Sequence, residues 1–371
     1  MVAILGLFSL PVYFYPFPQT ELLSTKRQHV PAVDLVIKKP KIIYGATEMW
    51  QKLSWSDVLK FDSCQYSNCI WKYSRTFEGV EQADVVIFAK VNYTRKFPDV
   101  SWETRQRQYW FMMTIESGVY QTHVFPDMYN GRFNGSIMYR QDATIYNPFG
   151  KTEISQSRSA KKIDFSKGKT MGAFAYVTRC NTFRYHRMRL MQALSRYIPV
   201  HIYSDNCRGL RIKKSPCPRL PSGSNPACET QAHRNYRFFF SFENSLCKDY
   251  ITEKFWDRLG SPSYFVPIAM GGLTVKEYTS VAPTDSFLHV YNFTSVHKLG
   301  KYLKYLMTND DAYNKYHHWR YNYKVNTDRN MSACEICRIA HEKPSLPAIA
   351  DIAKWRNDPS LCRGYYESRK F

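Results

Sequence analysis

One segment of the chain combines residue types that could bind a phosphorylated substrate. Phe238–Phe242 is an apolar run typical of a buried strand, and it is followed at once by Glu243–Ser245 and then by a helical start with Lys254. The free N–H groups at the start of a helix bind anions, and Asp249 is of a residue type that caps helices. The spacing therefore predicts a diphosphate site at the start of a helix, with Lys254 as its positive charge.

Two glutamates of the same segment, Glu243 and Glu253, could accept hydrogen bonds from the hydroxyl groups of a sugar or a ribose. Aromatic residues make up 16% of the chain, and flat rings often cover the apolar face of a sugar, although most rings fill cores. The alternative interpretation of the segment is a capped surface helix in which Lys254 pairs with a glutamate. Spacing alone leaves both interpretations open.

Strand-like and helix-like segments alternate on both sides of this segment and would have to position it. Apolar runs of strand type are Lys41–Tyr44, Ala83–Phe88, Ser136–Tyr139, Thr170–Thr178, Pro199–Tyr203, Tyr236–Phe242 and Tyr264–Met270. Helical spacing occurs at Arg105–Met113, Arg187–Tyr197 and Asp249–Leu259. Such alternation predicts an α/β fold with parallel sheets, in which ligands bind at the carboxyl ends of the strands.

A basic, serine-rich stretch at Gln156–Lys169 separates two cycles of this alternation, and 371 residues suffice for two ordinary cores. The prediction is therefore two Rossmann-like domains that face a cleft, at residues 41–160 and 161–333. The remaining parts are a signal or signal-anchor segment at 1–18, a stem at 19–40 and a C-terminal segment at 334–371.

The chain is strongly basic, since lysine and arginine outnumber aspartate and glutamate by 52 to 31 and leave a net charge of +21. Such a charge calls for an anionic partner: nucleic acid, an anionic membrane or a phosphorylated substrate. The basic residues are scattered, however, and neither zinc-finger spacing nor a basic-zipper pattern is present. Most of them are interpreted as solvated surface, and nucleic acid is disfavoured as a partner.

Cysteines and glycosylation sequons indicate the secretory route. The ten cysteines are an even number, which favours disulfides and an oxidising compartment. Four Asn-x-Ser/Thr sequons predict glycosylation at Asn92, Asn134, Asn292 and Asn330. Met1–Pro18 is apolar and uncharged, and a shortened signal-anchor is the favoured interpretation. A cleaved signal peptide and a sequence that lacks its true start are the alternatives.

Metal-ligating patterns are weak in this sequence. Cys334-Glu-Ile-Cys337 could be half of a zinc site or a redox pair, but the sequence has no second C-x-x-C pair. No Asp-x-Asp triplet lies in an obvious loop, and Asp310-Asp311 is interpreted as a helix cap. The sequence therefore predicts a protein that requires no metal.

The segment that ends at Lys254 resembles the signature of the α-1,3/α-1,4-fucosyltransferases, glycosyltransferase family 10. The shared pattern is FENS at Phe242–Ser245, three variable residues, DY at Asp249-Tyr250, one residue, and TEK at Thr252–Lys254. Val266-Pro267, followed by Gly271, resembles the family's downstream V-P-x-x-x-G. The wider resemblance runs from Lys41 to Trp355, and it implies two Rossmann-like domains of the GT-B type.

The resemblance implies that the second domain binds GDP-fucose. Lys254 would neutralise the diphosphate, Tyr250 and Glu253 would contact fucose or ribose, and Asn244 and Glu243 would shape the same pocket. Two further positions follow from the same comparison. Arg187, with His186 as the alternative, would reach the phosphates, and Thr178 would lie beside the nucleotide.

The resemblance also implies an inverting transfer from GDP-β-L-fucose to O3 of a GlcNAc residue, on the core or on an antenna of a glycoprotein N-glycan. A single displacement needs one carboxylate to take the proton of the acceptor hydroxyl. Glu116 in Thr114–Ser117 matches the family's E-S motif after a helix, and Ser136–Asp142 matches a Y-R-x-D segment. Glu116 is thus the implied base, and Tyr139 and Arg140 are implied to line the cleft on the acceptor side.

Cationic side chains can stabilise the departing GDP, so no cofactor is expected, although Mn²⁺ could stimulate the reaction. The family resemblance further implies disulfides that join an amino-terminal cysteine pair to the C-x-x-C, namely Cys64–Cys334 and Cys69–Cys337. The four cysteines of the second half leave three connectivities, of which Cys180–Cys228 with Cys207–Cys217 is favoured. Cys247 and Cys362 remain and are expected to pair.

The expected location is the Golgi membrane, as a single-pass type II protein with the catalytic domain in the lumen. Two departures from the family pattern raise an alternative function. Arg179 stands where the family usually has Asn, and Asp257-Arg258 stands where it has Asn-Ala. The alternative is a catalytically impaired glycan-binding or GDP-binding protein of the same fold.

Overall fold

The structure is a computed structural model. It describes residues 39–47, 60–89, 97–118, 127–155, 163–177, 180, 187–204, 207, 212–218, 220, 225–272, 274–328 and 330–362. All of its elements belong to the compact unit Pro40–Phe371. Several predicted features lie outside the described residues: the segment 1–18, the stem up to residue 38, Asn92, Thr178, Arg179, His186 and the side chain of Asn330.

The first sheet has six strands, all parallel, in the order β2-β1-β3-β4-β5-β6. The strands are β1 (Lys41–Gly45), β2 (Cys69–Tyr73), β3 (Val85–Ala89), β4 (Tyr109–Met113), β5 (Gly135–Met138) and β6 (Ile145–Tyr146). The short helices between them are η2 (Val80–Gln82), α2 (Trp102–Arg107) and η4 (Asp127–Tyr129).

The predicted helix over Arg105–Met113 is wrong. Helix α2 ends at Arg107, and the rest of the segment is strand β4, which pairs with both β3 and β5. Tyr, Trp and Phe favour strands, and four of the five residues of β4 are buried, with their side chains on both faces of the sheet. Burial on both faces erases the alternation that would have identified the strand.

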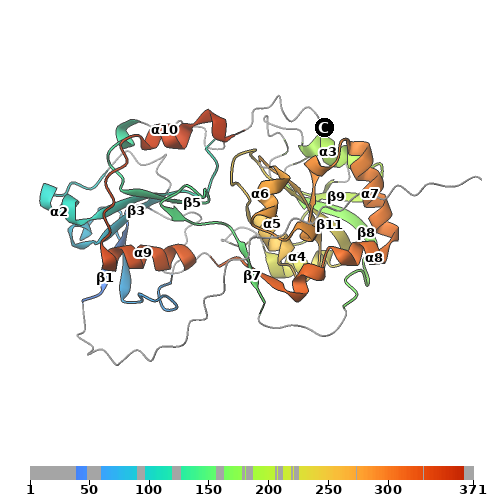
Figure 1. The fold of residues 1–371 in the computed structure, drawn as a ribbon, viewed down its shortest axis with the longest axis horizontal. Helices are drawn as coiled ribbons and strands as arrows, with labels where there is room; N and C mark the ends of the chain where they lie inside the picture. Colours follow the sequence, from blue (N-terminus) through green and yellow to red (C-terminus); the bar gives the residue numbers. More distant parts are fainter. Residues whose placement is uncertain are drawn as a thin grey trace, which may run out of the picture. The chain divides into compact units, whose positions relative to one another are not determined.

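Alternate residues of the first sheet enter two different cores. Val85 and Ile87 pack with Ile336 and other residues of α9 (Asn330–Glu342), whereas Val86 and Phe88 belong to a cluster on the other face. Figure 1 shows α9, which follows both sheets in the sequence, alongside β1 of the first sheet. The C-terminal part of the chain thus completes the first α/β unit.

The second sheet also has six parallel strands, in the order β10-β9-β8-β11-β12-β13. Its strands are β8 (Met171–Tyr176), β9 (Val200–Tyr203), β10 (Ile212–Lys213), β11 (Tyr236–Phe242), β12 (Val266–Met270) and β13 (Leu288–His289). Its helices are α3 (Arg187–Leu194), α4 (Pro226–His233), α5 (Glu253–Leu259), α6 (Val275–Thr279), α7 (Val296–Thr308), α8 (Asp310–Lys315), η5 (Thr284–Ser286), η6 (Val290–Asn292) and η7 (His318–Tyr321).

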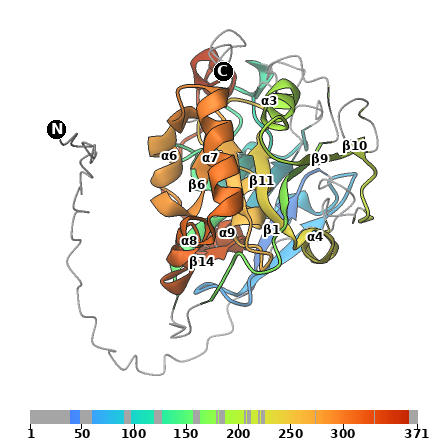
Figure 2. The same cartoon turned by 90° about the vertical axis from the view of Figure 1, so that its right-hand side faces the viewer.

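Strand β11 is buried along its whole length and supports the segment with the signature. Phe238, Phe240 and Phe242 point to the face covered by α3 and α7, while Phe239 packs with Phe174 on the other face. Figure 2 shows α7 lying across the sheet in front of β11. A continuous apolar run is the form that a parallel strand takes when helices cover both faces, so the prediction of this strand is confirmed.

Two antiparallel strands connect the halves: β7 (Lys151–Ile154) leads from the first sheet to the second, and β14 (Tyr323–Asn326) leads back. After α9, the chain continues to α10 (Ile352–Asn357) and η8 (Pro359–Leu361). Ile352 and Ala353 of α10 are buried in the cluster that contains Val86 and Phe88. Among the described residues, none of the helices combines the length and the apolar composition that a membrane crossing needs.

The favoured connectivity of the inner cysteines is wrong, because the structure joins Cys180 to Cys207 and Cys217 to Cys228. Cys180 follows β8 and Cys207 follows β9, and these neighbouring parallel strands end at the same edge of the sheet. Cys217 follows β10, next to Cys228 near the start of α4. Strand order therefore decides these pairs, and the sequence does not reveal strand order.

The other three disulfides join the expected partners: Cys64–Cys334, Cys69–Cys337 and Cys247–Cys362. The first two tie α9 to the segment before β2 and to the first residue of β2, across sequence separations of 270 and 268 residues. The sulfur atoms of Cys69 and Cys337 lie near His341, but both belong to the disulfide and are not metal ligands.

Two of the sequons differ sharply in their surroundings. The Asn134 amide donates a hydrogen bond to the Leu346 carbonyl at 2.7 Å, and Ser136 is only 1% exposed. A glycan on this amide nitrogen would have to fit beside the Leu346 contact and the buried Ser136. Asn292 and Thr294, by contrast, are exposed at the end of η6 and leave room for a glycan.

Candidate active site

The loop after β11 carries most of the residues singled out in the sequence, but its helix begins later than predicted. Helix α5 is Glu253–Leu259, and its N-cap is Thr252, which accepts a hydrogen bond from the N–H of Lys254. Asp249 is not a cap: its φ is 58°, and its carboxylate accepts the N–H of Gln141 in the first half at 3.1 Å. The predicted helix from Asp249 is therefore wrong, because a tertiary partner takes the carboxylate.

Glu243 connects the two ends of this loop by hydrogen bonds. Its side chain is completely buried, and its carboxylate accepts hydrogen bonds from the Thr252 N–H at 2.8 Å and the Thr252 hydroxyl at 2.7 Å. Burial raises the pKa of Glu243 to about 7, against the opposing charge of Lys254, whose Nζ lies 3.7 Å away. Glu243 thus shapes the site from behind and takes its hydrogen bonds from the protein.

Lys254 lies next to Glu243 and Thr252, nearer to the surface. Its Nζ donates to Glu253 Oε1 at 2.9 Å and to Thr252 Oγ1 at 3.0 Å, and its side chain is 25% exposed. Burial lowers the pKa of Lys254, but the charges of Glu253 and Glu243 outweigh this effect, and the net pKa is raised. Lys254 therefore carries its charge at neutral pH and remains accessible to an anion.

A second cation approaches from α3. Arg187 is 5% exposed, and its Nη1 donates to the carbonyl of Phe242 at 3.4 Å, where β11 ends. Its charge is close enough to oppose the protonation of Lys254. Two positive side chains from separate helices therefore converge beyond β11, as a diphosphate site requires.

Asn244 and the glycines after β12 complete this side of the site. The Asn244 side-chain oxygen is buried and has no hydrogen-bond partner in the described part of the chain, so it can accept a bond from a ligand. Gly272 lies against the loop, since a Cβ there would overlap the backbone of Leu246 and Cys247. Only glycine fits at this contact, which places the residue after the V-P-x-x-x-G segment against the two residues that follow FENS.

Glu116 comes from the first half, three residues after β4 ends. The expectation that it follows a helix is wrong, because the segment before it is a strand. The Tyr250 hydroxyl donates a hydrogen bond to Glu116 Oε2 at 3.0 Å, and the Ser117 hydroxyl donates to the Ser245 hydroxyl at 2.7 Å. The signature loop of the second half therefore touches the E-S motif of the first half directly.

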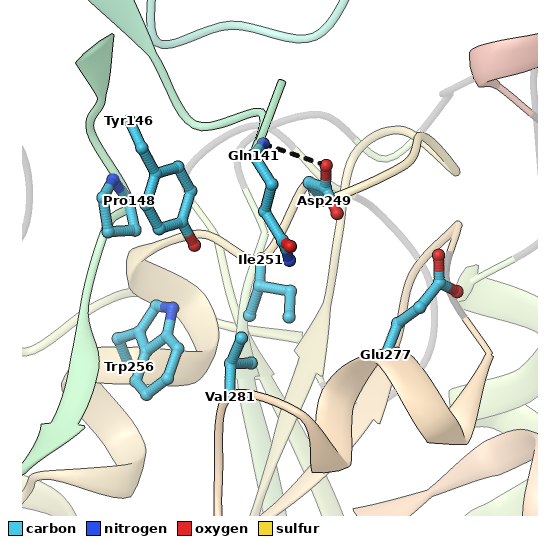
Figure 3. A pocket seen from close by; sticks show the side chains of 8 residues that line it. All are labelled: Gln141, Tyr146, Pro148, Asp249, Ile251, Trp256, Glu277 and Val281. Atoms are coloured by element: carbon cyan, nitrogen blue, oxygen red, sulfur yellow. Dashed lines mark hydrogen bonds between the residues drawn. The ribbon is translucent and has the colours of Figure 1, made fainter. Parts of the chain in front are cut away.

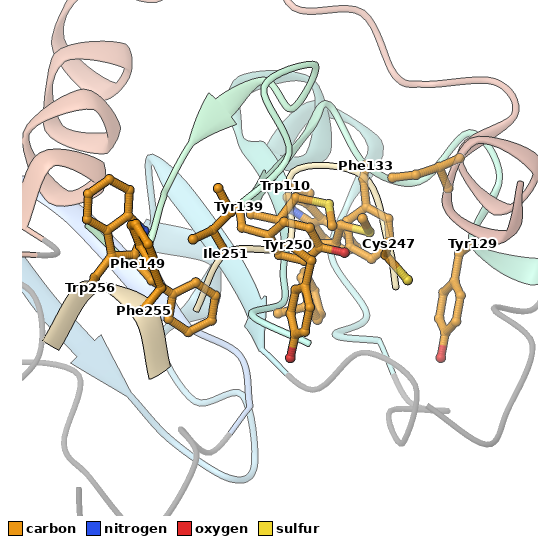
Figure 4. Packing of buried hydrophobic residues seen from close by; sticks show 14 of the residues in the cluster. Trp110, Tyr129, Phe133, Tyr139, Phe149, Cys247, Tyr250, Ile251, Phe255 and Trp256 are labelled. Atoms are coloured by element: carbon orange, nitrogen blue, oxygen red, sulfur yellow. The ribbon is translucent and has the colours of Figure 1, made fainter. Parts of the chain in front are cut away.

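Tyr250 and Tyr139 form the aromatic centre of this contact, as Figure 4 shows. Their ring centroids lie 4.9 Å apart in an edge-to-face arrangement, and the rings are 2% and 3% exposed. Burial raises the pKa of Tyr139 to about 12, and burial together with the Glu116 charge raises the pKa of Tyr250 well above its usual value of 10. Tyr250 therefore stays protonated and acts as a hydrogen-bond donor.

Arg140 is engaged with the C-terminal segment. Its Nε donates to Asp142 Oδ1 at 2.7 Å, its Nη1 donates to the Trp355 carbonyl at 3.0 Å, and its guanidinium lies 4.0 Å from the Trp355 ring centroid. The side chain is 4% exposed. The structure thus places Arg140 between β5 and α10, where it holds the fold, and not at a surface where an acceptor could reach it.

Arg258, the departure from the family pattern in α5, is also neutralised. It is 6% exposed, it forms an ion pair with Glu229 of α4, and its guanidinium lies 4.7 Å from the Phe239 ring centroid. The pair lies on the α4 side of the sheet, and Lys254 lies at the opposite end of α5. No spacing in the sequence relates Glu229 to Arg258, so this compensation could not be found in advance.

A small pocket of about 10 Å³ opens beside these loops and is shown in Figure 3. Its lining residues are Gln141, Tyr146 and Pro148 from the first half, and Asp249, Ile251, Trp256, Glu277 and Val281 from the second. Sequence reasoning missed Gln141, Tyr146 and Glu277, which carry no motif. A space of this size holds about one water molecule, so it is a polar edge of the site and not a pocket for a whole sugar.

Comparisons with known proteins match this arrangement. The family model for the C-terminal part of glycosyltransferase family 10 (fucosyltransferase) matches residues 166–355, and the model for the N-terminal part of fucosyltransferases matches residues 38–150. The two models meet near the ribbon of β7 and β14, and each covers one of the two sheets.

Relatives by sequence include two invertebrate proteins. The chain is 30% identical over 236 residues to the Caenorhabditis elegans alpha-(1,3)-fucosyltransferase fut-1, with 60% of this chain and 51% of that protein covered. It is 26% identical over 332 residues to the Drosophila melanogaster glycoprotein 3-alpha-L-fucosyltransferase A, with 87% and 61% covered. The chain thus spans about half to three fifths of the length of these relatives.

Two solved structures share the fold. A crystal structure of an alpha1,3-fucosyltransferase with GDP-fucose superposes with a TM-score of 0.52 at 14% identity, over 84% of this chain and 92% of that one. Another crystal structure of an alpha1,3-fucosyltransferase has a TM-score of 0.50 at 13% identity, over 86% and 94%. The prediction of two Rossmann-like units of the GT-B type is confirmed by this shared fold and by the two parallel sheets.

Proposed function

Because the chain belongs to the fucosyltransferases of glycosyltransferase family 10, we propose that it transfers L-fucose from GDP-β-L-fucose to O3 of a GlcNAc residue on an N-glycan, with inversion. One observation carries the proposal. The hydrogen bond from Tyr250 to Glu116 joins the donor signature of one half to a carboxylate of the other half. A base and a donor site that meet at one point are what a single displacement needs.

In this proposal, Lys254 and Arg187 bind the diphosphate of the donor, and the Asn244 side-chain oxygen accepts a hydrogen bond from a hydroxyl group of the fucose or the ribose. Glu253, which is 40% exposed, exchanges its bond to Lys254 for the hydroxyl groups of fucose or ribose. Thr178 is proposed to lie beside the nucleotide. Since the two cations stabilise the departing phosphate charge, the reaction requires neither a proton donor for GDP nor a metal, although Mn²⁺ could stimulate it.

Glu116 is proposed as the general base. As O3 of the acceptor attacks C1 of fucose, the bond from C1 to the GDP oxygen breaks, and the proton of the O3 hydroxyl passes to the Glu116 carboxylate. Tyr250 holds Oε2 of this carboxylate and so fixes its orientation. The reverse face of C1 is attacked, which converts the β-linked donor into an α-fucoside.

The acceptor is proposed to be a GlcNAc of a glycoprotein N-glycan, since the Drosophila relative is named a glycoprotein fucosyltransferase. The Rattus norvegicus relative, 28% identical, is named for a 4-galactosyl-N-acetylglucosaminide, so antennal GlcNAc is the other acceptor to test. The five disulfides support a lumenal catalytic domain, and we propose the Golgi membrane as its location.

The test is fucose transfer by the purified lumenal part. GDP release is measured with GDP-fucose and two glycan sets, one with an unsubstituted chitobiose core and one with antennal N-acetyllactosamine, and mass spectrometry locates the added fucose. Glu116→Gln should lower kcat by about 10²–10⁴-fold while GDP still binds. Full turnover by this variant would refute the base assignment, and GDP binding without transfer by the wild type would favour the binding-protein alternative.

A further inference from the structure

Arg356 on α10 contacts the main chain of the proposed base. It is 5% exposed, and its Nη2 donates a hydrogen bond to the carbonyl of Glu116 at 3.1 Å. Gly118 leaves room for the guanidinium, since a Cβ at this position would overlap Arg356 Nη1. The C-terminal family match ends at residue 355, so this contact comes from a part of the chain that the family model does not cover.

The charge of Arg356 also acts on the site. Burial and the nearby charge of Arg140 lower the pKa of Arg356, while Tyr139 and Glu116 favour its charged form. The groups near Glu116 include Tyr250 from the donor loop, Tyr139 after β5 and Arg356 from α10. Among these three, only Arg356 carries a positive charge that can hold the Glu116 carboxylate ionised.

Two attachments, one on each side of Arg356, keep it in place. On one side, the Trp355 indole donates to Asp142 Oδ2 at 3.0 Å and stacks with Arg140, both of which follow β5. On the other side, Cys362 is bonded to Cys247 of the donor loop. The segment from Trp355 to Cys362 therefore connects the first half to the signature loop of the second half, past Glu116.

We propose that Arg356 is a positioning residue for Glu116. Its guanidinium fixes the main chain of the base, its charge keeps the carboxylate ionised, and the Cys247–Cys362 bond holds α10 in register with the donor loop. This inference rests on the proposed fucose transfer with Glu116 as its base.

The test compares Arg356→Gln and Arg356→Lys in GDP-release assays across pH. Arg356→Gln should lower kcat about tenfold, leave KM for GDP-fucose within about twofold, and move the acid limb of kcat/KM upward by about one pH unit. Arg356→Lys keeps the charge and should restore the position of the limb. Arg237→Gln is the matched control, since Arg237 is equally buried and donates to the Leu306 carbonyl at 3.0 Å in the second half. Arg237→Gln should lower the stability of the protein but leave the acid limb of kcat/KM at its wild-type pH.

Since Arg356 is buried, Arg356→Gln could fail to fold, and Gly118→Ala is the second variant. The added Cβ displaces the guanidinium from Glu116 while the charge stays in the chain, so the limb should move in the same direction by a smaller amount. Wild-type transfer with an unchanged limb in the variants that fold would overturn the positioning role alone. Wild-type protein that releases no GDP would overturn the proposed function as well.

Discussion

The hydrogen bond between Tyr250 and Glu116 yields the sharpest prediction, for Tyr250→Phe. The substitution removes only the hydroxyl that donates to Glu116 Oε2 at 3.0 Å, and the ring that packs 4.9 Å from Tyr139 remains. A hydrogen bond to a charged group contributes about 1.5–3 kcal/mol. At about 1.4 kcal/mol per factor of ten, the loss should weaken the ionised form of Glu116 by about 10- to 150-fold relative to the protonated form, which raises its pKa.

The pKa of Glu116 should rise, because the Tyr250 hydroxyl binds the ionised form of the carboxylate. Tyr250 stays protonated and stabilises the ionised carboxylate, so its loss keeps the base protonated to a higher pH. At a pH below the wild-type acid limb, kcat/KM should fall by roughly 10- to 150-fold. Above the limb of the variant, Glu116 is ionised in both proteins, and the remaining difference in kcat/KM measures the lost orientation of the carboxylate.

The assay is GDP release by wild type and variant from pH 5 to 9 with a saturating acceptor. Tyr313→Phe is the matched control, since the Tyr313 hydroxyl is buried and donates to the carbonyls of Arg237 at 2.9 Å and Tyr264 at 2.7 Å, away from Glu116. It should lower the unfolding temperature without moving the limb. A limb at the wild-type position in Tyr250→Phe would refute the electrostatic reasoning.

The remaining predictions concern the donor side and its support. Lys254→Met should weaken GDP binding by about 10- to 100-fold in calorimetry, since a charge-assisted contact is lost, and an unchanged affinity would remove Lys254 from the diphosphate site. Gly272→Ala should cost about 1–3 kcal/mol of stability and raise KM for GDP-fucose, because its Cβ overlaps the backbone after FENS, and a wild-type KM would contradict this. Arg258→Ala should cost about 3–5 kcal/mol in denaturant unfolding, as it leaves Glu229 buried without its cation, and Arg258→Leu with Glu229→Leu should recover most of that loss; equal losses in both would contradict the ion-pair argument.

Local sequence patterns predicted an element correctly where its structure depends on its own residues. The apolar run of β11 predicted a strand covered on both faces, and the structure buries each of its residues. The start of α5 was placed at Asp249, because Asp is a good cap, yet Gln141 takes that carboxylate and Thr252 caps the helix instead. Helix-capping propensity could not predict that Asp249 binds Gln141 instead of capping the helix, since the two residues are 108 positions apart.

The same limit explains the cysteines and the buried ion pair. Cys180 bonds Cys207 because β8 and β9 are neighbours in the sheet, and strand order is a property of the whole fold. Arg258 resembled a defect in the sequence, but α4 brings Glu229 to it in the interior. A departure from a family pattern therefore has to be judged together with the residues that pack around it.

By itself, the sequence determined the two parallel α/β units and the identity of the donor loop, because hydrophobic runs and a dense signature are local properties of the chain. Only the tertiary structure decided which residues meet at the site. Tyr250 reaches Glu116 across 134 residues, and Arg356 reaches it across 240. No local interaction couples residues so far apart: the carboxyl ends of two separate sheets, and a C-terminal segment bonded to the donor loop, must come together before these contacts exist.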